Sequence, residues 1–193
     1  MNLLIDTLPL AYEFGGRVYK MQTDFREWIK FELLFTDKDI TPKDKKLRLL
    51  EIIFPEIPPV NEELWDFLLW FYQCGGEPVS SRGGKGKAKK ETAVYSFEYD
   101  DGYIYADFMS VYQIDLADIP YLHWWKFKAM FRSLHDCKMS AIMQYRAEEI
   151  TSKTPAYRKD FLMEMKRVYA LPRSISEQQK INELKRLKEQ MGV

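Results

Sequence analysis

Two adjacent tryptophans, Trp124 and Trp125, constrain the fold more than any other feature of the chain. They lie in a segment whose apolar residues recur at helical spacing, in a stripe formed by Trp124, Phe127, Phe131 and Leu134. Successive residues of a helix point about 100° apart, so both indoles cannot enter one face. Either this helix is sandwiched between two layers of the protein, or Trp125 and the nearby Tyr121 meet a binding partner.

Helical patterns dominate the rest of the chain. Start signals at Thr23 or Asp24, at Thr41-Pro42 and at Asn61 predict three helices before residue 77. The helix of the paired tryptophans is predicted to open at residues 118–120, and further helices are expected at about 139–150 and 155–170.

Strand signals are few. Gly15-Gly16 separates two short apolar runs and can supply the positive φ angles of a tight turn, which predicts a small N-terminal β-hairpin. Residues 103–112 fit either a strand or a helix, so a short second β-hairpin near residues 94–106 stays open. The predicted fold class is mostly α.

A chain of 193 residues suits one compact domain. Its expected parts are an N-terminal hairpin with three helices (1–76), a flexible basic linker (77–92), a helical part with the paired tryptophans (93–171) and a C-terminal amphipathic helix (172–193). In that last helix Ile181, Leu184 and Leu187 form a narrow apolar seam, typical of a coiled-coil strand or of a helix that is ordered only when it docks.

Charge is unevenly distributed although the net charge is zero. Residues 1–76 carry 9 basic and 13 acidic side chains, residues 93–150 carry 5 and 9, and residues 151–193 carry 10 and 5. Such blocks can attract one another within a chain or between copies, which favours a homo-oligomer. The linker's basic residues are candidates for phosphate contacts: Arg82, Lys85, Lys87, Lys89 and Lys90. The neutral chain and the lack of aromatics among them argue against nucleic acid as the main partner.

Several other classes of function find little support. Cys74, Cys137, His123 and His135 lack the paired spacings of a metal site, and the glycines near Lys85 lack the spacing of a phosphate loop. We therefore expect no metal, no cofactor and no catalytic residues. The apolar run 64–72 is too short to span a membrane, and two cysteines without a leader sequence suggest a reducing cytoplasm.

The paired tryptophans also belong to a longer pattern. It comprises Tyr103-Ile104-Tyr105, Tyr112-Gln113-Ile114-Asp115-Leu116 and Leu122-His123-Trp124-Trp125-Lys126-Phe127, together with Thr23-Asp24-Phe25-Arg26. This pattern resembles the bacteriophage "gene product fifteen" family of tail-morphogenesis proteins over about residues 20–150.

The resemblance implies a chaperone-like role in phage tail assembly, in the cytoplasm of the infected or lysogenic host. The implied partners are the long helical tape-measure protein and the tail tube subunits. Tyr121, Trp125, Ile181, Leu184 and Leu187 are the expected contact residues. Two alternatives remain open: a structural tail component of the mature virion, and a nucleic-acid-binding phage protein that acts through the basic linker.

Overall fold

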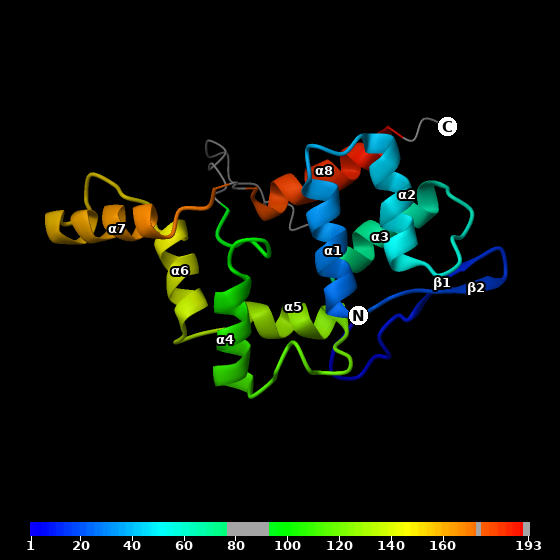
Figure 1. The fold of residues 1–193 in the computed structure, drawn as a ribbon, viewed down its shortest axis with the longest axis horizontal. Coiled ribbons are helices and arrows are strands. Elements are labelled where there is room, and N and C mark those ends of the chain that lie inside the picture. Colours follow the sequence, from blue (N-terminus) through cyan, green and yellow to red (C-terminus); the bar gives the residue numbers. More distant parts are fainter. Residues whose placement is uncertain (77–92, 173–174, 191–193) are drawn as a thin grey trace. The chain divides into compact units, whose positions relative to one another are not determined.

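The computed structural model describes residues 1–76, 93–172 and 175–190, and this part is mostly α, as predicted (Figure 1). One small antiparallel sheet precedes all the described helices. The elements are β1 (Ala11–Phe14), β2 (Arg17–Lys20), α1 (Phe25–Thr36), α2 (Pro42–Ile53), α3 (Glu62–Tyr72), α4 (Asp101–Tyr112), α5 (Trp124–Arg132), α6 (Lys138–Ala147), α7 (Ala156–Val168) and α8 (Glu177–Glu189).

The predicted N-terminal hairpin is confirmed. Strands β1 and β2 pair from Ala11 opposite Lys20 to Phe14 opposite Arg17. Gly15 and Gly16 connect them with φ angles of +58° and +76°, which side chains with a Cβ adopt only at a cost.

Three helix starts also lie where the sequence places them. The side chains of Asp24, Thr41 and Asn61 accept hydrogen bonds from backbone N–H groups in the first turns of α1, α2 and α3. These N–H groups have no partner inside their own helix, so each cap stabilises its helix by about 1 kcal/mol.

The possible second hairpin near residues 94–106 is absent, because the sequence forms a turn and the start of α4 there. The side chain of Asp100 explains the turn: its Oδ2 accepts the N–H of Ser96 at 2.9 Å and a hydrogen bond from Arg146 at 2.6 Å. This buried acceptor holds residues 96–100 in a compact turn where a strand would have to be extended.

The predicted start of the paired-tryptophan helix is wrong by several residues. Helix α5 begins at Trp124, and residues 118–120 belong to the preceding loop. There the Oδ1 atom of Asp115 accepts the N–H groups of Ala117 at 2.8 Å and Asp118 at 3.3 Å. Local side-chain bonds of this kind compete with helix formation.

The chain divides into two compact units. Of the described residues, unit 1 comprises 1–76, 121–129 and 179–190, and unit 2 comprises 93–120, 130–172 and 175–178. The core of unit 1 is aromatic: Trp28 lies 4.5 Å from Phe71 and 6.4 Å from Trp124 between ring centroids. In unit 2, Phe108, Met139, Ile142 and Leu162 are fully buried. None of the helices in the described residues is both long and apolar enough to cross a membrane.

Candidate functional site

Two segments of the sequence pattern, about one hundred residues apart, meet in unit 1. The N–H of Phe25 donates to the carbonyl of Leu122 at 2.9 Å, and the N–H of Trp124 donates to the carbonyl of Thr23 at 2.8 Å. Asp24 and His123 form the isolated antiparallel bridge between these bonds. The bridge holds the first residues of α1 and α5 side by side.

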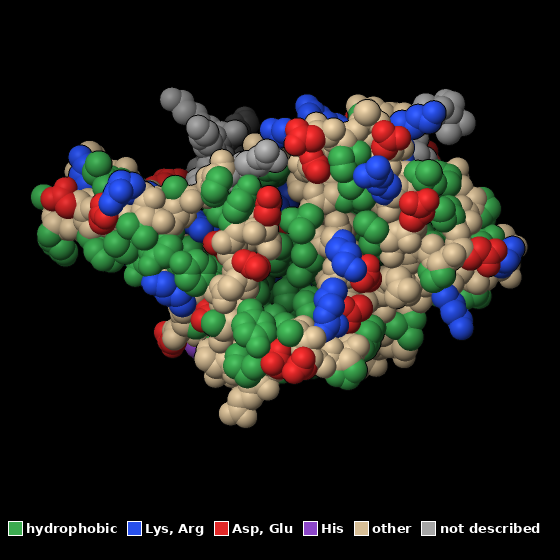
Figure 2. Space-filling view, viewed as in Figure 1, with side chains coloured by type: hydrophobic (Ala, Val, Ile, Leu, Met, Phe, Trp, Pro, Cys, Tyr) green, Lys and Arg blue, Asp and Glu red, His purple; other side chains and the backbone are tan. Residues whose placement is uncertain are grey.

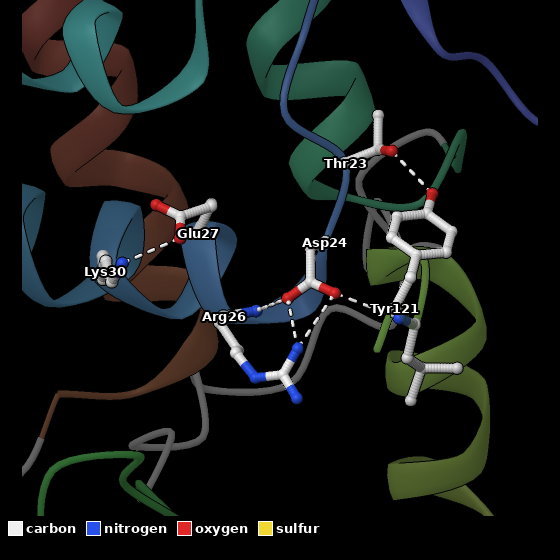
Figure 3. A network of polar contacts seen from close by, with 7 residues as sticks. Thr23, Asp24, Arg26, Glu27, Lys30 and Tyr121 are labelled. Carbon is white, nitrogen blue, oxygen red and sulfur yellow. Dashed lines mark hydrogen bonds and ion pairs between the residues drawn. The ribbon is translucent and has the colours of Figure 1, made fainter. Parts of the chain in front are cut away.

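The carboxylate of Asp24 connects both sides of this bridge (Figure 3). Its Oδ1 atom caps α1 by accepting the N–H of Arg26 at 3.0 Å, and its Oδ2 atom accepts the N–H of Leu122 at 3.0 Å. The guanidinium of Arg26 lies 3.2 Å from the same carboxylate. Asp24 thus has a structural role, because each of its carboxylate oxygens accepts two hydrogen bonds within unit 1.

His123 is a neutral, structural histidine. Its Nδ1 atom accepts the N–H of Trp125 at 3.1 Å, so the proton resides on Nε2, which donates to the carbonyl of Pro9 at 3.2 Å. Burial lowers the pKa of His123 below its ordinary value, and the positive charge of Lys126 lowers it further, against an opposing effect of the bond to Pro9. The imidazole holds the N-terminal segment against the start of α5.

Both tryptophans are core residues, so Trp125 is not a surface contact in this structure. The indole N–H of Trp124 donates to the carbonyl of Tyr72 at 3.0 Å, and that of Trp125 donates to the carbonyl of Phe71 at 2.8 Å. Both side chains are at most 3 % exposed. Because α5 begins at Trp124, both indoles lie in its first turn, where unit 1 encloses them. This is the buried alternative of the sequence analysis.

Gly75 shows how closely the chain approaches Trp125. It has a φ of +73°, and a Cβ added there would lie 2.7 Å from the Cη2 atom of Trp125. Only glycine fits both the backbone conformation and the contact.

Tyr121 is the only one of the five predicted contact residues with an exposed side chain. It is 48 % exposed, and its hydroxyl shares a hydrogen bond of 2.6 Å with Oγ1 of Thr23 (Figure 3). This bond fixes the ring at the surface of unit 1. A partner could therefore pack on it without first ordering it.

The C-terminal seam is used within the chain. Ile181, Leu184 and Leu187 are 9 %, 1 % and 2 % exposed, with α8 docked in unit 1. They do not form a free partner surface in this structure, because unit 1 supplies the apolar environment that the seam requires. The sequence left open a coiled-coil strand or a helix that is ordered only when it docks. In the structure the helix is docked, and the same chain provides the site.

Helix α4 of unit 2 has exposed apolar side chains that were not predicted from the sequence. Tyr103, Tyr105, Met109 and Val111 are each 36–39 % exposed. Figure 2 shows hydrophobic side chains over this helix with acidic ones beside them. The sequence does contain a sign of this feature, because residues 93–120 contain no Lys or Arg and an apolar run too long for a solvated loop. The exposed side could not be predicted because residues 103–112 fit either a strand or a helix.

The remaining candidates have little geometry to support them. Arg82, Lys85, Lys87, Lys89 and Lys90 lie outside the described residues. Within the described part of the chain, His, Cys, Asp and Glu form no cluster suited to a metal ion. Cys74 and Cys137 are not joined by a disulfide, and they lie in different units.

Comparison with known proteins gives one family and no individual relative. No curated protein and no solved structure matches the chain. Residues 4–171 match the family described as "Bacteriophage Gp15 protein". This match covers both segments of the β-bridge, the paired tryptophans and α4, and it ends before α8. The chain therefore belongs to the bacteriophage Gp15 protein family.

Proposed function

We propose that this protein is a chaperone-like factor of phage tail assembly, which binds the tape-measure protein and keeps it soluble until tube subunits polymerise around it. It acts by binding rather than catalysis, without a cofactor, in the cytoplasm of the infected or lysogenic bacterium. Several copies coat one tape-measure chain, and contacts between copies contribute to the coat. Membership of a bacteriophage protein family supports a role in a phage. The main support for a binding role is the exposed apolar side of α4.

Helix α4 is apolar on more sides than its own unit covers. Only Ile104, Asp107 and Phe108 of this helix are buried, whereas Tyr105 and Met109 lie one turn apart on the exposed side. A helix that is apolar all round is usually buried on all sides, so the exposed side of α4 is suited to a partner. Amphipathic helices of a client protein can pack on such a surface.

The α4 surface is also ordered before a partner arrives. The hydroxyl of Tyr105 donates to Oδ2 of Asp115 at 3.1 Å, and that of Tyr112 donates to the carbonyl of Met130 at 2.9 Å. Fixed aromatic side chains lose little conformational entropy on binding, which favours affinity. On unit 1, Tyr121 is a second proposed contact, fixed in the same way by Thr23.

Co-expression with the tape-measure protein of the same phage tests the proposal. We expect a soluble complex that contains several copies of this chain, as measured by pull-down and light scattering. Met109→Asp introduces a charge into the α4 surface and should prevent the complex. Met163→Asp is the matched control, because Met163 is 54 % exposed on α7, and it should behave like wild type.

A tape-measure protein that stays insoluble, with nothing co-purifying, would refute the proposal. Mass spectrometry of purified virions then decides the alternative. A structural tail component would be present in stoichiometric amount, whereas a chaperone-like factor should be absent.

A further inference from the structure

Helix α8 packs against unit 1 through one face. At 100° per residue, five of its side chains fall within an arc of about 120°. They are Lys180, Ile181, Leu184, Leu187 and Lys188. The three apolar ones and Lys180 are buried, while the outward residues Asn182, Arg186 and Glu189 are exposed. The buried side chains of residues 180–189 therefore lie on one narrow face of α8.

Both lysines of this face form ion pairs with acidic side chains of unit 1. The Nζ atom of Lys180 lies 2.5 Å from Oε1 of Glu32 on α1, and the hydroxyl of Tyr72 donates to the other oxygen of Glu32 at 2.7 Å. The Nζ atom of Lys188 lies 3.0 Å from Glu62 and 2.6 Å from Asp66, both on α3. The docking site thus combines apolar contacts with an acidic group near each end.

We propose that the site under α8 is a binding groove for a basic amphipathic helix of the client protein, and that α8 is a displaceable internal occupant. The client helix carries Lys or Arg eight residues apart, flanking apolar residues at the positions of Ile181, Leu184 and Leu187. This inference rests on the proposed function, since it takes the client to be the helical tape-measure protein.

Three properties of α8 make it displaceable. Its docking depends on three apolar side chains, because the rest of Glu177–Glu189 is polar or charged. A helix of this length is marginal alone in water, so its order depends on docking. The buried pair of Lys180 and Glu32 adds specificity more than stability, since the cost of removing both charges from water offsets their attraction. A helix with the same charges and more apolar residues therefore displaces α8.

A labelled peptide of residues 175–193 is the probe, and fluorescence anisotropy measures its affinity for the full-length protein. In wild type, α8 competes with the peptide for the groove. The apparent affinity is therefore the affinity of the empty groove multiplied by the fraction of molecules in which α8 has left it. Leu184→Ala in the protein weakens this internal competitor, so we expect the peptide to bind at least about tenfold more tightly than to wild type. Leu47→Ala is the matched control, because Leu47 is 55 % exposed on α2.

A milder pair of variants keeps the test valid if Leu184→Ala fails to fold by circular dichroism. Lys188→Glu places a negative charge against Glu62 and Asp66, whereas Arg186→Glu changes an exposed residue whose ion pair lies within α8. Peptide binding should strengthen severalfold for Lys188→Glu alone. Equal affinities for wild type and the folded variants, or no binding to any of them, would overturn the proposal.

The test separates this inference from the proposed function because it contains no tape-measure protein. Tight peptide binding together with a failed pull-down would refute the client and leave the groove. A successful pull-down without peptide binding would refute the groove alone. A Leu184→Ala protein that dimerises in light scattering, with the peptide unable to bind, would assign the groove to α8 of a second copy and overturn the client assignment.

Discussion

Replacing Arg146 by Met should strongly destabilise unit 2. The guanidinium donates to both carboxylate oxygens of Asp100, at 2.6 Å and 2.9 Å, and also to the carbonyls of Val94 at 3.0 Å and Tyr169 at 2.8 Å. The side chains of the ion pair are 8 % and 2 % exposed. Methionine fills much of the volume but leaves the Asp100 carboxylate buried without its cation.

Loss of one partner from a buried ion pair costs about 3–5 kcal/mol, mainly because the remaining charge is unpaired. Taking about 4 kcal/mol, and a change in Tm of about 2–4 °C per kcal/mol for a chain of this size, we expect Tm to fall by about 8–16 °C. The carbonyls of Val94 and Tyr169 lose their donors as well, which acts in the same direction.

Urea and thermal unfolding, followed by circular dichroism, measure the effect. Arg167→Met is the matched control, because the pair of Arg167 and Glu164 is 75 % and 50 % exposed and solvent screens its attraction, so its loss should leave stability nearly unchanged. Asp100→Asn combined with Arg146→Met removes both charges and should cost less than the sum of the single changes. A loss below about 1 kcal/mol for Arg146→Met, or strict additivity in the double variant, would refute the reasoning.

Three further outcomes follow from unit 1. Gly75→Ala should lower the free energy of unfolding by more than about 1 kcal/mol, measured by urea unfolding, because the new Cβ meets Trp125 at a φ of +73°; an unchanged midpoint would contradict the contact. Asp24→Ala should cost more than Thr41→Ala in the same assay, since both lose a helix cap worth about 1 kcal/mol but only Asp24 also bonds the β-bridge; equal losses would show that the second bond contributes nothing. The pKa of His123 is lower in the folded protein, so the unfolded chain binds this proton more readily. The contribution of His123 to the free energy of unfolding is therefore fully present above about pH 6.5 and is lost as the pH falls below that value. His123→Asn keeps an acceptor for the helix start but cannot titrate, so its unfolding midpoint should fall less than that of wild type between about pH 7.5 and pH 5.5; parallel profiles would refute this role.

Predictions based on local chemistry were confirmed. The helix starts at Asp24, Thr41 and Asn61 depend on hydrogen bonds between residues two or three apart, and the hairpin around Gly15-Gly16 pairs residues at most nine apart. The sequence around each position therefore contains the information. The mostly α class follows from the same short-range patterns.

Predictions that needed distant partners were incomplete. The start of α5 was placed too early because Leu122 and His123 pair with Thr23–Phe25, and no local pattern reveals such a bridge. Helix α4 was ambiguous because its periodicity fits both states, and the buried bond between Asp100 and Arg146 favours the turn before it. Whether Trp125 is buried or contacts a binding partner could not be predicted, because an indole suits a core and an interface equally well.

The helical class, the hairpin, the caps and the family pattern can be predicted without a structure, because they arise from turn residues, helix caps and side-chain periodicity in short stretches of the chain. The burial of Trp125, the docking of the α8 seam in unit 1 and the exposed apolar side of α4 became clear only from the folded molecule. The reason is that a side chain is buried only when a surface from a distant part of the sequence packs against it. The free energy gained depends on both surfaces, so it cannot be calculated from either segment alone.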